Sequence, residues 1–166
     1  ADLDHADAWV GRILRSAVAH GRIRRIDVSR ARALAGVVAV VTGEDCPHAF
    51  GVLPIAMNEY PLARDKVRYR GEPVAAVAAV DAATAEQALR LIHLEIDELP
   101  ACYSIAAARA PDAAQLHDDK PGNLERNVDF ELGSVAEAFA ASDLVREATY
   151  NCAEVCQNQM EMHAAV

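Results

Sequence analysis

The clearest chemical pattern in the sequence is a row of four cations at every second position. They are Arg64, Lys66, Arg68 and Arg70. In an extended chain these residues share one face, with Val67 and Tyr69 on the other. Such a row could line a path for an anionic substrate. The simpler interpretation is a solvated strand face, or salt bridges to a neighbouring subunit. We prefer it because charge stripes on strand faces are common.

Cysteine and histidine residues form no convincing reactive or metal-binding group. Cys152 and Cys156 could suggest a metal pair, but zinc sites normally bring a second pair, which this sequence lacks. Cys46 and His48 lack the third group that would orient a nucleophile. No glycine-rich phosphate-binding pattern occurs. No shared spacing links the histidines His20, His93, His117 and His163. We therefore predict no catalytic residue and no metal ligand.

The segment 64–99 predicts a β-β-α-β unit on which the rest of the chain must pack. Gly71-Glu72-Pro73 ends the charged strand, because Pro73 has no amide hydrogen and a fixed φ. Residues 74–80 (VAAVAAV) are all apolar and predict a strand buried on both faces. Asp81 is expected to cap the following helix. Its inward stripe is predicted to be Ala85, Ala88, Leu89 and Ile92, and Leu94 and Ile96 mark the closing strand.

The residues before this unit predict two more strands and a long loop. The first strand-like segment starts with residues 9–13. Ser29 is expected to cap a short helix at 30–34, and Gly36 suits the C′ position after that helix. Residues 37–41 (VVAVV) predict a second doubly buried strand. The loop 43–61 carries exposed apolar residues, which favours a contact surface. The inward positions of this half are predicted to be Val18, Ile23, Ile26 and Val28.

The residues after this unit predict a polar linker and a further β-α-β. The best boundary lies at 115–123, where Pro121-Gly122 is a strong turn signal. Strands are expected at 128–132 and 144–150. Between them Ser134 should cap a helix that turns Val135, Ala138 and Phe139 inward.

Composition limits the class of protein. The chain has 166 residues, 52% of them hydrophobic, and a net charge of −9, which argues against nucleic acid as a partner. No apolar run approaches a membrane span, and the first ten residues lack a signal peptide's basic region. Four scattered cysteines do not make a secreted disulfide scaffold. We expect a cytoplasmic protein.

Several motifs together resemble one family. RDKVRYRGEPVAAVAAVDAATAEQAL, with GRILRS, HGRI and GVVAVVTGED before it, resembles the start of the molybdenum-binding large subunit of the xanthine oxidase family. The resemblance implies an α+β fold, an α/β hammerhead with a mixed sheet and short packed helices, followed by the first β-α-β of a second domain. The expected division is 1–112 hammerhead, 113–127 linker and 128–166 the start of a molybdopterin-binding domain. Because the last strand stops mid-pattern, we expect a fragment that is inactive alone.

The resemblance also implies cofactors and partners. The longer protein would use molybdopterin cytosine dinucleotide, with [2Fe–2S] clusters and FAD on partner subunits or domains, in a dimer of heterotrimers. The fragment itself is expected to hold no cofactor. The last residues resemble a segment beside the molybdenum centre. In the family this segment carries a glutamine close to the metal, but the matching position in this sequence is Val155. Gln157 and Gln159 lie nearby but out of register, so the glutamine's role is not transferred to them. Glu161 is expected to act as a structural anchor.

Within the family, the loop GVLPIAMNEYP and the last fifteen residues most resemble 4-hydroxybenzoyl-CoA reductases. These remove a phenolic hydroxyl reductively from an aromatic CoA thioester, an anionic substrate of the kind the row of cations could serve. The alternatives are a hydroxylase of aldehydes, purines or aromatic heterocycles in the same family, and a scaffold or binding module without redox chemistry.

Overall fold

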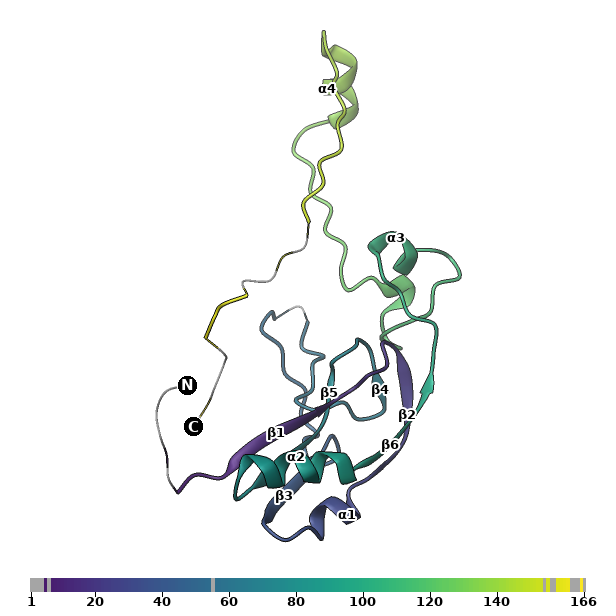
Figure 1. The fold of residues 1–166 in the computed structure, drawn as a ribbon. Coiled ribbons are helices and arrows are strands. Elements are labelled where there is room, and N and C mark those ends of the chain that lie inside the picture. Colours follow the sequence, from purple (N-terminus) through teal and green to yellow (C-terminus); the bar gives the residue numbers. More distant parts are fainter. Residues whose placement is uncertain are drawn as a thin grey trace. The chain divides into compact units, whose positions relative to one another are not determined.

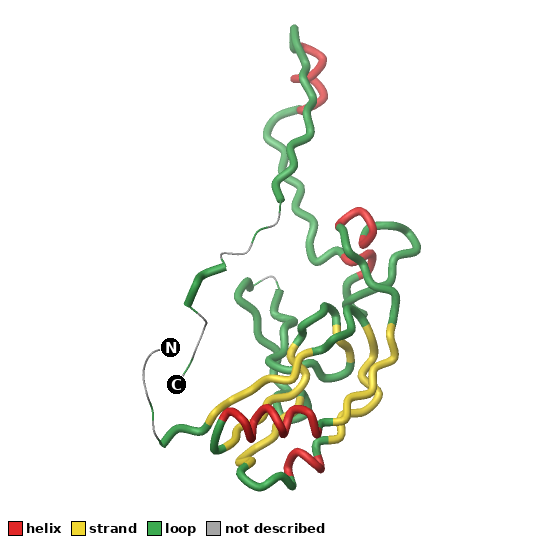
Figure 2. Tube along the Cα trace, in the orientation of Figure 1, coloured by secondary structure: helices red, strands yellow, loops and turns green. Residues whose placement is uncertain are grey.

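The computed structural model describes residues 5, 7–54, 56–153, 155, 158–161 and 165. The chain divides into two compact units, residues 7–126 and residues 1–6 with 127–166 (Figures 1 and 2). The larger unit contains β1 (Val10–Arg15), β2 (Gly21–Asp27), α1 (Ser29–Arg32), β3 (Val37–Thr42), β4 (Lys66–Val67), β5 (Pro73–Ala79), α2 (Ala82–Leu91), β6 (His93–Glu98), α3 (Ile105–Ala108) and the 3₁₀ helix η1 (Pro121–Asn123).

The strand β5 is the centre of a three-stranded sheet with the order β1-β5-β3. Both pairings are antiparallel: Ile13 of β1 lies opposite Ala76, and Val40 of β3 lies opposite Val77. An all-apolar strand suits this place, because it has a hydrogen-bonded neighbour on each edge and packing on its faces. The predicted buried strand is confirmed, although it ends at Ala79 and Val80 is 55% exposed.

The helix α2 covers one face of this sheet (Figure 1). It begins where predicted, because the carboxylate of Asp81 accepts a hydrogen bond from the Thr84 amide at 2.7 Å. Ala85 and Ala88 are fully buried on its inner side. Since each contributes only a methyl group, the helix can lie close to the strands. The main core that results contains Val28, Ala31, Val40, Ala75, Val77, Ala79, Ala85, Ala88 and Ile92.

A second sheet has the order β4-β2-β6 and a small core of its own. Ile23 of β2 pairs with Ile96 of β6, and both pack against the buried Val67 and Val74. The two sheets with their short packed helices confirm the α+β class. The described strand pairs are antiparallel in both sheets, where a mixed sheet was expected.

Three local predictions in this unit are wrong. The valine-rich β3 lies at the edge of its sheet, so only Val40 is buried and Val38 is 41% exposed. Ser29 is the first residue of α1 rather than its cap. The carboxylate of Asp27 accepts hydrogen bonds from the amide and hydroxyl of Ser29, at 3.0 and 2.7 Å, and takes the capping role. Gly36 was expected to end this helix, but α1 ends at Arg32 with its C-cap at Ala33, and Gly36 lies in a separate turn with φ +88°.

The long connection between β3 and β4 is a loop with one β-bridge, between Phe50 and Glu59. Its apolar residues are largely exposed: Val52 is 86% exposed, Leu53 58% and Met57 55%. The expectation that this loop serves as a contact surface stays a prediction.

The smaller unit contains one helix, α4 (Val135–Ala141), among its described residues. The hydroxyl of Ser134 accepts a hydrogen bond from the Glu137 amide at 3.3 Å, so the predicted cap is confirmed. The strands predicted at 128–132 and 144–150 do not form, and Val135 and Phe139, expected to face inward, are 48% and 58% exposed. A strand needs a hydrogen-bonded neighbour, and the described residues offer none here.

Candidate functional site

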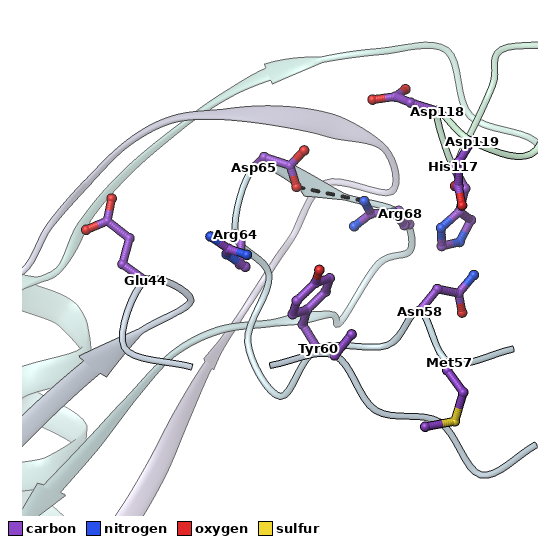
Figure 3. Close-up of a pocket in the computed structure, with 11 residues that line it drawn as sticks. Glu44, Met57, Asn58, Tyr60, Arg64, Asp65, Arg68, His117, Asp118 and Asp119 are labelled. Carbon is purple, nitrogen blue, oxygen red and sulfur yellow. Dashed lines mark ion pairs between the residues drawn. The ribbon is translucent and has the colours of Figure 1, made fainter. Parts of the chain in front are cut away.

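The larger unit contains a polar cleft of about 680 Å³ (Figure 3). Three segments form it: the loop after β3, the approach to β4, and the chain just before η1. Its described lining residues are Glu44, Ala49, Met57, Asn58, Tyr60, Arg64, Asp65, Arg68, His117, Asp118 and Asp119.

Two cations of the predicted row lie in this cleft. The guanidinium of Arg64 lies 5.5 Å from the centroid of the Tyr60 ring, within cation–π range. Arg68 donates a hydrogen bond to the Lys66 carbonyl at 3.0 Å and lies 3.8 Å from a carboxylate oxygen of Asp65. Its Nε atom is buried and has no hydrogen-bond partner among the described residues. Arg68 therefore contacts both the Lys66 carbonyl in β4 and the Asp65 carboxylate in the cleft.

Burial and hydrogen bonding shift the pKa values of three groups in or beside the cleft. Burial, with the nearby Arg68 charge, lowers the pKa of His117, so its imidazole is neutral at pH 7. Burial raises the pKa of Glu72, although the backbone amide of Arg68 donates to its carboxylate. The pKa of Asp118 is lowered because its carboxylate accepts a hydrogen bond from Lys66.

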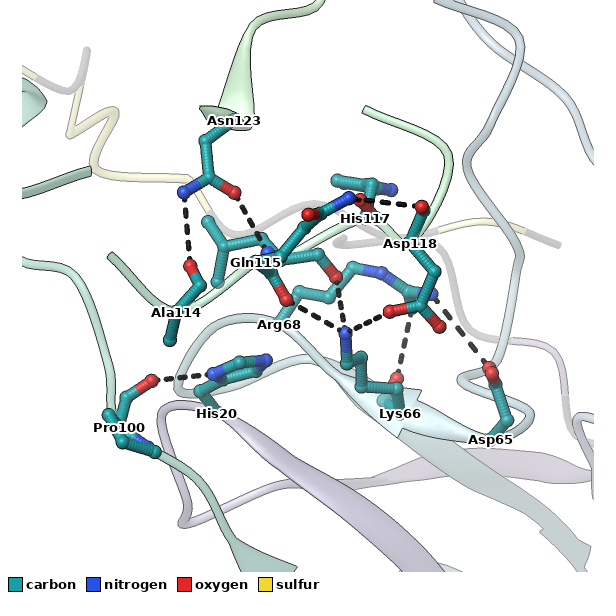
Figure 4. Close-up of polar contacts among 11 residues, drawn as sticks. His20, Asp65, Lys66, Arg68, Pro100, Ala114, Gln115, His117, Asp118 and Asn123 are labelled. Carbon is teal, nitrogen blue, oxygen red and sulfur yellow. Dashed lines mark hydrogen bonds and ion pairs between the residues drawn. The ribbon is translucent and has the colours of Figure 1, made fainter. Parts of the chain in front are cut away.

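Lys66 is a buried cation, with only 2% of its surface exposed (Figure 4). Its Nζ donates to the carbonyl oxygens of Gln115 and Leu116 and to Oδ1 of Asp118, each at 2.9 Å. An ammonium group has three hydrogens, so this set satisfies its donors fully. Burial of a charge demands such partners.

His20 is a second buried side chain, 2% exposed, and its contact with Pro100 is drawn in Figure 4. Its Nδ1 is 2.6 Å from the carbonyl oxygen of Pro100, which can only accept, so Nδ1 carries the hydrogen and donates. Its Nε2 is buried without a described partner. His20 thereby links the start of β2 to the chain that leaves β6.

The prediction of a solvated row of cations holds only in part: Arg64 and Arg70 are exposed, whereas Lys66 is buried and Arg68 half-buried. β4 has only two residues, Lys66 and Val67, and both are buried, while Tyr69 is 57% exposed. The alternation fails because the chain turns at Gly71 and because residues 115–118 cover Lys66. The cleft also carries four carboxylates against the two guanidinium groups of Arg64 and Arg68, so its lining does not form a cationic path.

The predicted segment beside the cofactor is described only in part. Val155 is 88% exposed, and Gln159 and Glu161 are exposed, each with a contact to another group. Gln157 lies outside the described residues. The structure therefore leaves the assignment of this segment as a prediction.

The expectation that the fragment itself holds no cofactor stays a prediction. Among the described residues no three His, Cys, Asp or Glu side chains gather to hold a metal ion. Val155 and Met160, in the predicted segment, are 88% and 101% exposed.

The cleft includes residues that the sequence did not single out, among them Tyr60, Asp118 and Asp119. The run HDDK at 117–120 was interpreted as linker. The signal that could have found it is the charge pattern: a lysine next to a buried valine in a short strand needs an acidic partner, and this run offers two.

The chain matches known proteins along its length. The family model described as "Aldehyde oxidase and xanthine dehydrogenase, a/b hammerhead domain" matches residues 1–100. A probable xanthine dehydrogenase subunit from Bacillus subtilis is 38% identical over 99% of this chain and 22% of its own length. The nicotinate dehydrogenase large molybdopterin subunit of Eubacterium barkeri is 34% identical over 100% of this chain and 39% of its own.

Solved structures agree. Quinoline 2-oxidoreductase from Pseudomonas putida 86 superposes with a TM-score of 0.71 at 35% identity, over 86% of this chain and 19% of that one. The aldehyde oxidoreductase from Desulfovibrio gigas superposes with a TM-score of 0.66 at 27% identity, over 85% of this chain and 16% of that one.

The chain spans between a fifth and two fifths of the length of the two curated relatives described. Among the described residues no helix is long and apolar enough to cross a bilayer. The match over residues 1–100, the two antiparallel sheets and the capped α2 agree on one assignment. The chain belongs to the aldehyde oxidase and xanthine dehydrogenase family, and residues 1–100 are its α/β hammerhead domain.

Proposed function

We infer that this chain is part of the molybdenum-binding subunit of a molybdopterin-dependent oxidoreductase. The observation that carries this proposal is the extent of the similarity: it runs over 100% of the chain in a relative named a large molybdopterin subunit, well past the hammerhead domain. Residues 1–112 would be the hammerhead, 113–127 the connection, and 128–166 the start of the molybdopterin-binding domain. The division into units at 126 and 127 supports this boundary.

The role proposed for this part is structural support of the active site. In a cofactor enzyme the protein holds the reactive atom against the substrate and excludes water. The exposed apolar loop residues Phe50, Val52 and Leu53 suit a buried contact with the rest of such a subunit. The segment containing Val155, Gln157, Gln159 and Glu161 would lie near the cofactor, molybdopterin cytosine dinucleotide.

We favour an aromatic N-heterocycle or a purine as the substrate of the whole enzyme. Relatives and solved structures carry the names nicotinate dehydrogenase, hypoxanthine oxidase and quinoline 2-oxidoreductase, and each is at least 33% identical to this chain. In this reaction class an oxygen atom from water enters the product and two electrons pass to an acceptor. Iron–sulfur clusters and FAD on partner subunits or domains, in a dimer of heterotrimers in the cytoplasm, would carry those electrons away.

A second candidate is reductive dehydroxylation by a 4-hydroxybenzoyl-CoA reductase. The resemblance of the loop GVLPIAMNEYP favours it. The cleft beside this loop, with its four carboxylates, offers no added support for an anionic CoA thioester. The heterocycle therefore remains the first choice.

The first experiment is metal analysis of the complete gene product that contains this chain. It should be expressed with its neighbouring genes in a host that makes the cofactor, and its molybdenum and iron content measured. We expect stoichiometric molybdenum together with iron. A folded, full-length product with neither metal would contradict the proposal that the protein is a molybdenum enzyme. The remaining interpretation would be a scaffold or binding module with the hammerhead fold.

The substrate experiment follows on the metal-loaded complex. Nicotinate, hypoxanthine and quinoline are supplied with an artificial electron acceptor in ¹⁸O-labelled water, and 4-hydroxybenzoyl-CoA is supplied with a low-potential reductant in a separate reaction. Label in a heterocyclic product supports hydroxylation. Formation of benzoyl-CoA, with no labelled heterocycle, would instead support the 4-hydroxybenzoyl-CoA reductase activity.

A further inference from the structure

We propose that residues 113–126 form a strap that the buried cation Lys66 latches onto the hammerhead, and that this latch opens locally while the sheets stay folded. The strap includes η1 and supplies one wall of the polar cleft. The proposal concerns a conformational device within residues 7–126 and does not depend on the proposed enzymatic activity.

The latch is a single ammonium group with all its partners on the strap. Lys66 is held in place by the pairing of β4 with β2, where it lies opposite Arg22. Its Nζ reaches Gln115, Leu116 and Asp118, three acceptors that lie about fifty residues away in sequence and within four residues of one another. The buried charge loses these acceptors together when the strap leaves, so the contact is made or broken as a unit.

Apart from the Lys66 bonds, the strap makes few contacts with the sheets and the loops between their strands. None of its described residues is buried, so apolar packing contributes little to its attachment. Asn58, whose side-chain amide donates to Glu125 at 3.3 Å, supplies a further polar contact at its far end. Segments with few buried apolar contacts open at lower free energy than the core.

The strap also keeps its own shape, so it can move as one piece. The amide group of Asn123 donates to the carbonyl oxygens of Ala108 and Ala114, at 2.9 and 3.0 Å, and its Oδ1 accepts from the Leu116 amide at 2.8 Å. Lys120 pairs with Glu125 at 3.0 Å. The bond to Ala108 ties the strap to the end of α3, the other contacts lie within the strap, and none of them needs a partner on the sheets.

Opening of the latch would remodel the cleft. His117, Asp118 and Asp119 line it, and Asp118 is also a Lys66 acceptor (Figures 3 and 4). When the strap leaves, the cleft loses this wall, and Lys66 becomes accessible to solvent. The accessibility of Lys66 therefore reports directly on the open state.

The test is amine labelling of the 166-residue chain, which contains only two lysines, Lys66 and Lys120. A small acylating reagent is applied under native conditions, and mass spectrometry measures the rate at which each lysine is modified. Lys120, whose side chain is 26% exposed, is the internal reference. We expect Lys66 to react roughly a hundredfold more slowly than Lys120 in the wild type, because it reacts only after opening.

A matched pair of variants locates the latch. Asp118→Asn removes the carboxylate that binds Lys66, and we expect Lys66 labelling to rise about threefold to tenfold. Asp119→Asn is the control, since the carboxylate of Asp119 pairs with Lys120 instead, and Lys66 labelling should stay within about twofold of wild type. Both carboxylates are more than half exposed, so neither change threatens the fold.

The urea dependence of labelling separates strap opening from unfolding. Local opening exposes little surface, so the Lys66 rate should change with urea much less steeply than global unfolding does. A Lys66 rate equal to that of Lys120 in the wild type would overturn the proposal. Equal rates in Asp118→Asn and Asp119→Asn, or a urea slope equal to that of global unfolding, would also overturn it.

Discussion

The close approach of α2 to its sheet can be tested by enlarging one buried alanine. Ala85 is 0% exposed, and its neighbours in the main core include Ala75, Ala79 and Val77 of β5. Ala85→Leu adds three carbon atoms. If the core had room, their burial would stabilise the fold by about 2.4 kcal/mol, at about 0.8 kcal/mol per methylene.

The structure predicts the opposite sign, because the facing residues are short side chains on a paired strand that cannot turn aside. Overpacking of this kind costs about 1–3 kcal/mol. We expect Ala85→Leu to lower the free energy of unfolding by about 2 kcal/mol, and the midpoint of thermal unfolding by roughly 8 °C at about 4 °C per kcal/mol.

The matched control is Ala83→Leu, which makes the same chemical change at an exposed position of the same helix. Alanine and leucine both favour helices, so its free energy of unfolding should stay within about 0.5 kcal/mol of wild type. Urea unfolding followed by far-ultraviolet circular dichroism measures both. Equal stability of the two variants would refute the close packing of α2 on the sheet.

Three further predictions concern backbone contact and pH. Gly43→Ala should lower the free energy of unfolding by about 1–3 kcal/mol, because its added Cβ would lie 2.4 Å from a backbone carbonyl oxygen. Gly11→Ala is the control: its added Cβ meets nothing within 4 Å, so its free energy of unfolding should be unchanged or slightly higher. Urea titrations measure both. The folded-state pKa of Asp118 is lowered by Lys66, so its stabilising contribution is present above the unfolded pKa and is lost as the pH falls through the folded one. Stability curves measured from pH 6 to pH 2 should fall less in Asp118→Asn than in wild type, and parallel curves would contradict this. The pKa of Glu72 is raised by burial, so its contribution has the opposite sign and is lost as the pH rises through the folded value. Glu72→Gln should therefore gain stability relative to wild type above that pH, and a constant difference at every pH would be evidence against it.

Features that depend on neighbouring residues were predictable from the sequence. The caps at Asp81 and Ser134 are examples, because the cap and the amide it binds lie three residues apart. The inward stripe of α2 follows in the same way from helical spacing.

Features that depend on partners far along the chain were not predictable. The runs at 37–41 and 74–80 are equally apolar, yet one is at the edge of the sheet and the other at its centre. Hydropathy measures a strand's own side chains and says nothing of how many neighbours it has. The burial of Lys66 is a similar case, because its acceptors come from a segment some fifty residues away. The candidate residues at 155–161 remain predictions.

The distribution of buried residues has a consequence for the heat absorbed on unfolding. Every residue described as buried lies between 16 and 92, and none of those described beyond 100 is buried. A chain of 166 residues that melted throughout would absorb roughly 115 kcal/mol near 60 °C, whereas residues 7–100 alone account for roughly 65 kcal/mol. Scanning calorimetry of this chain should therefore show a single endotherm whose area corresponds to the hammerhead, with a shallow sloping baseline from the remainder.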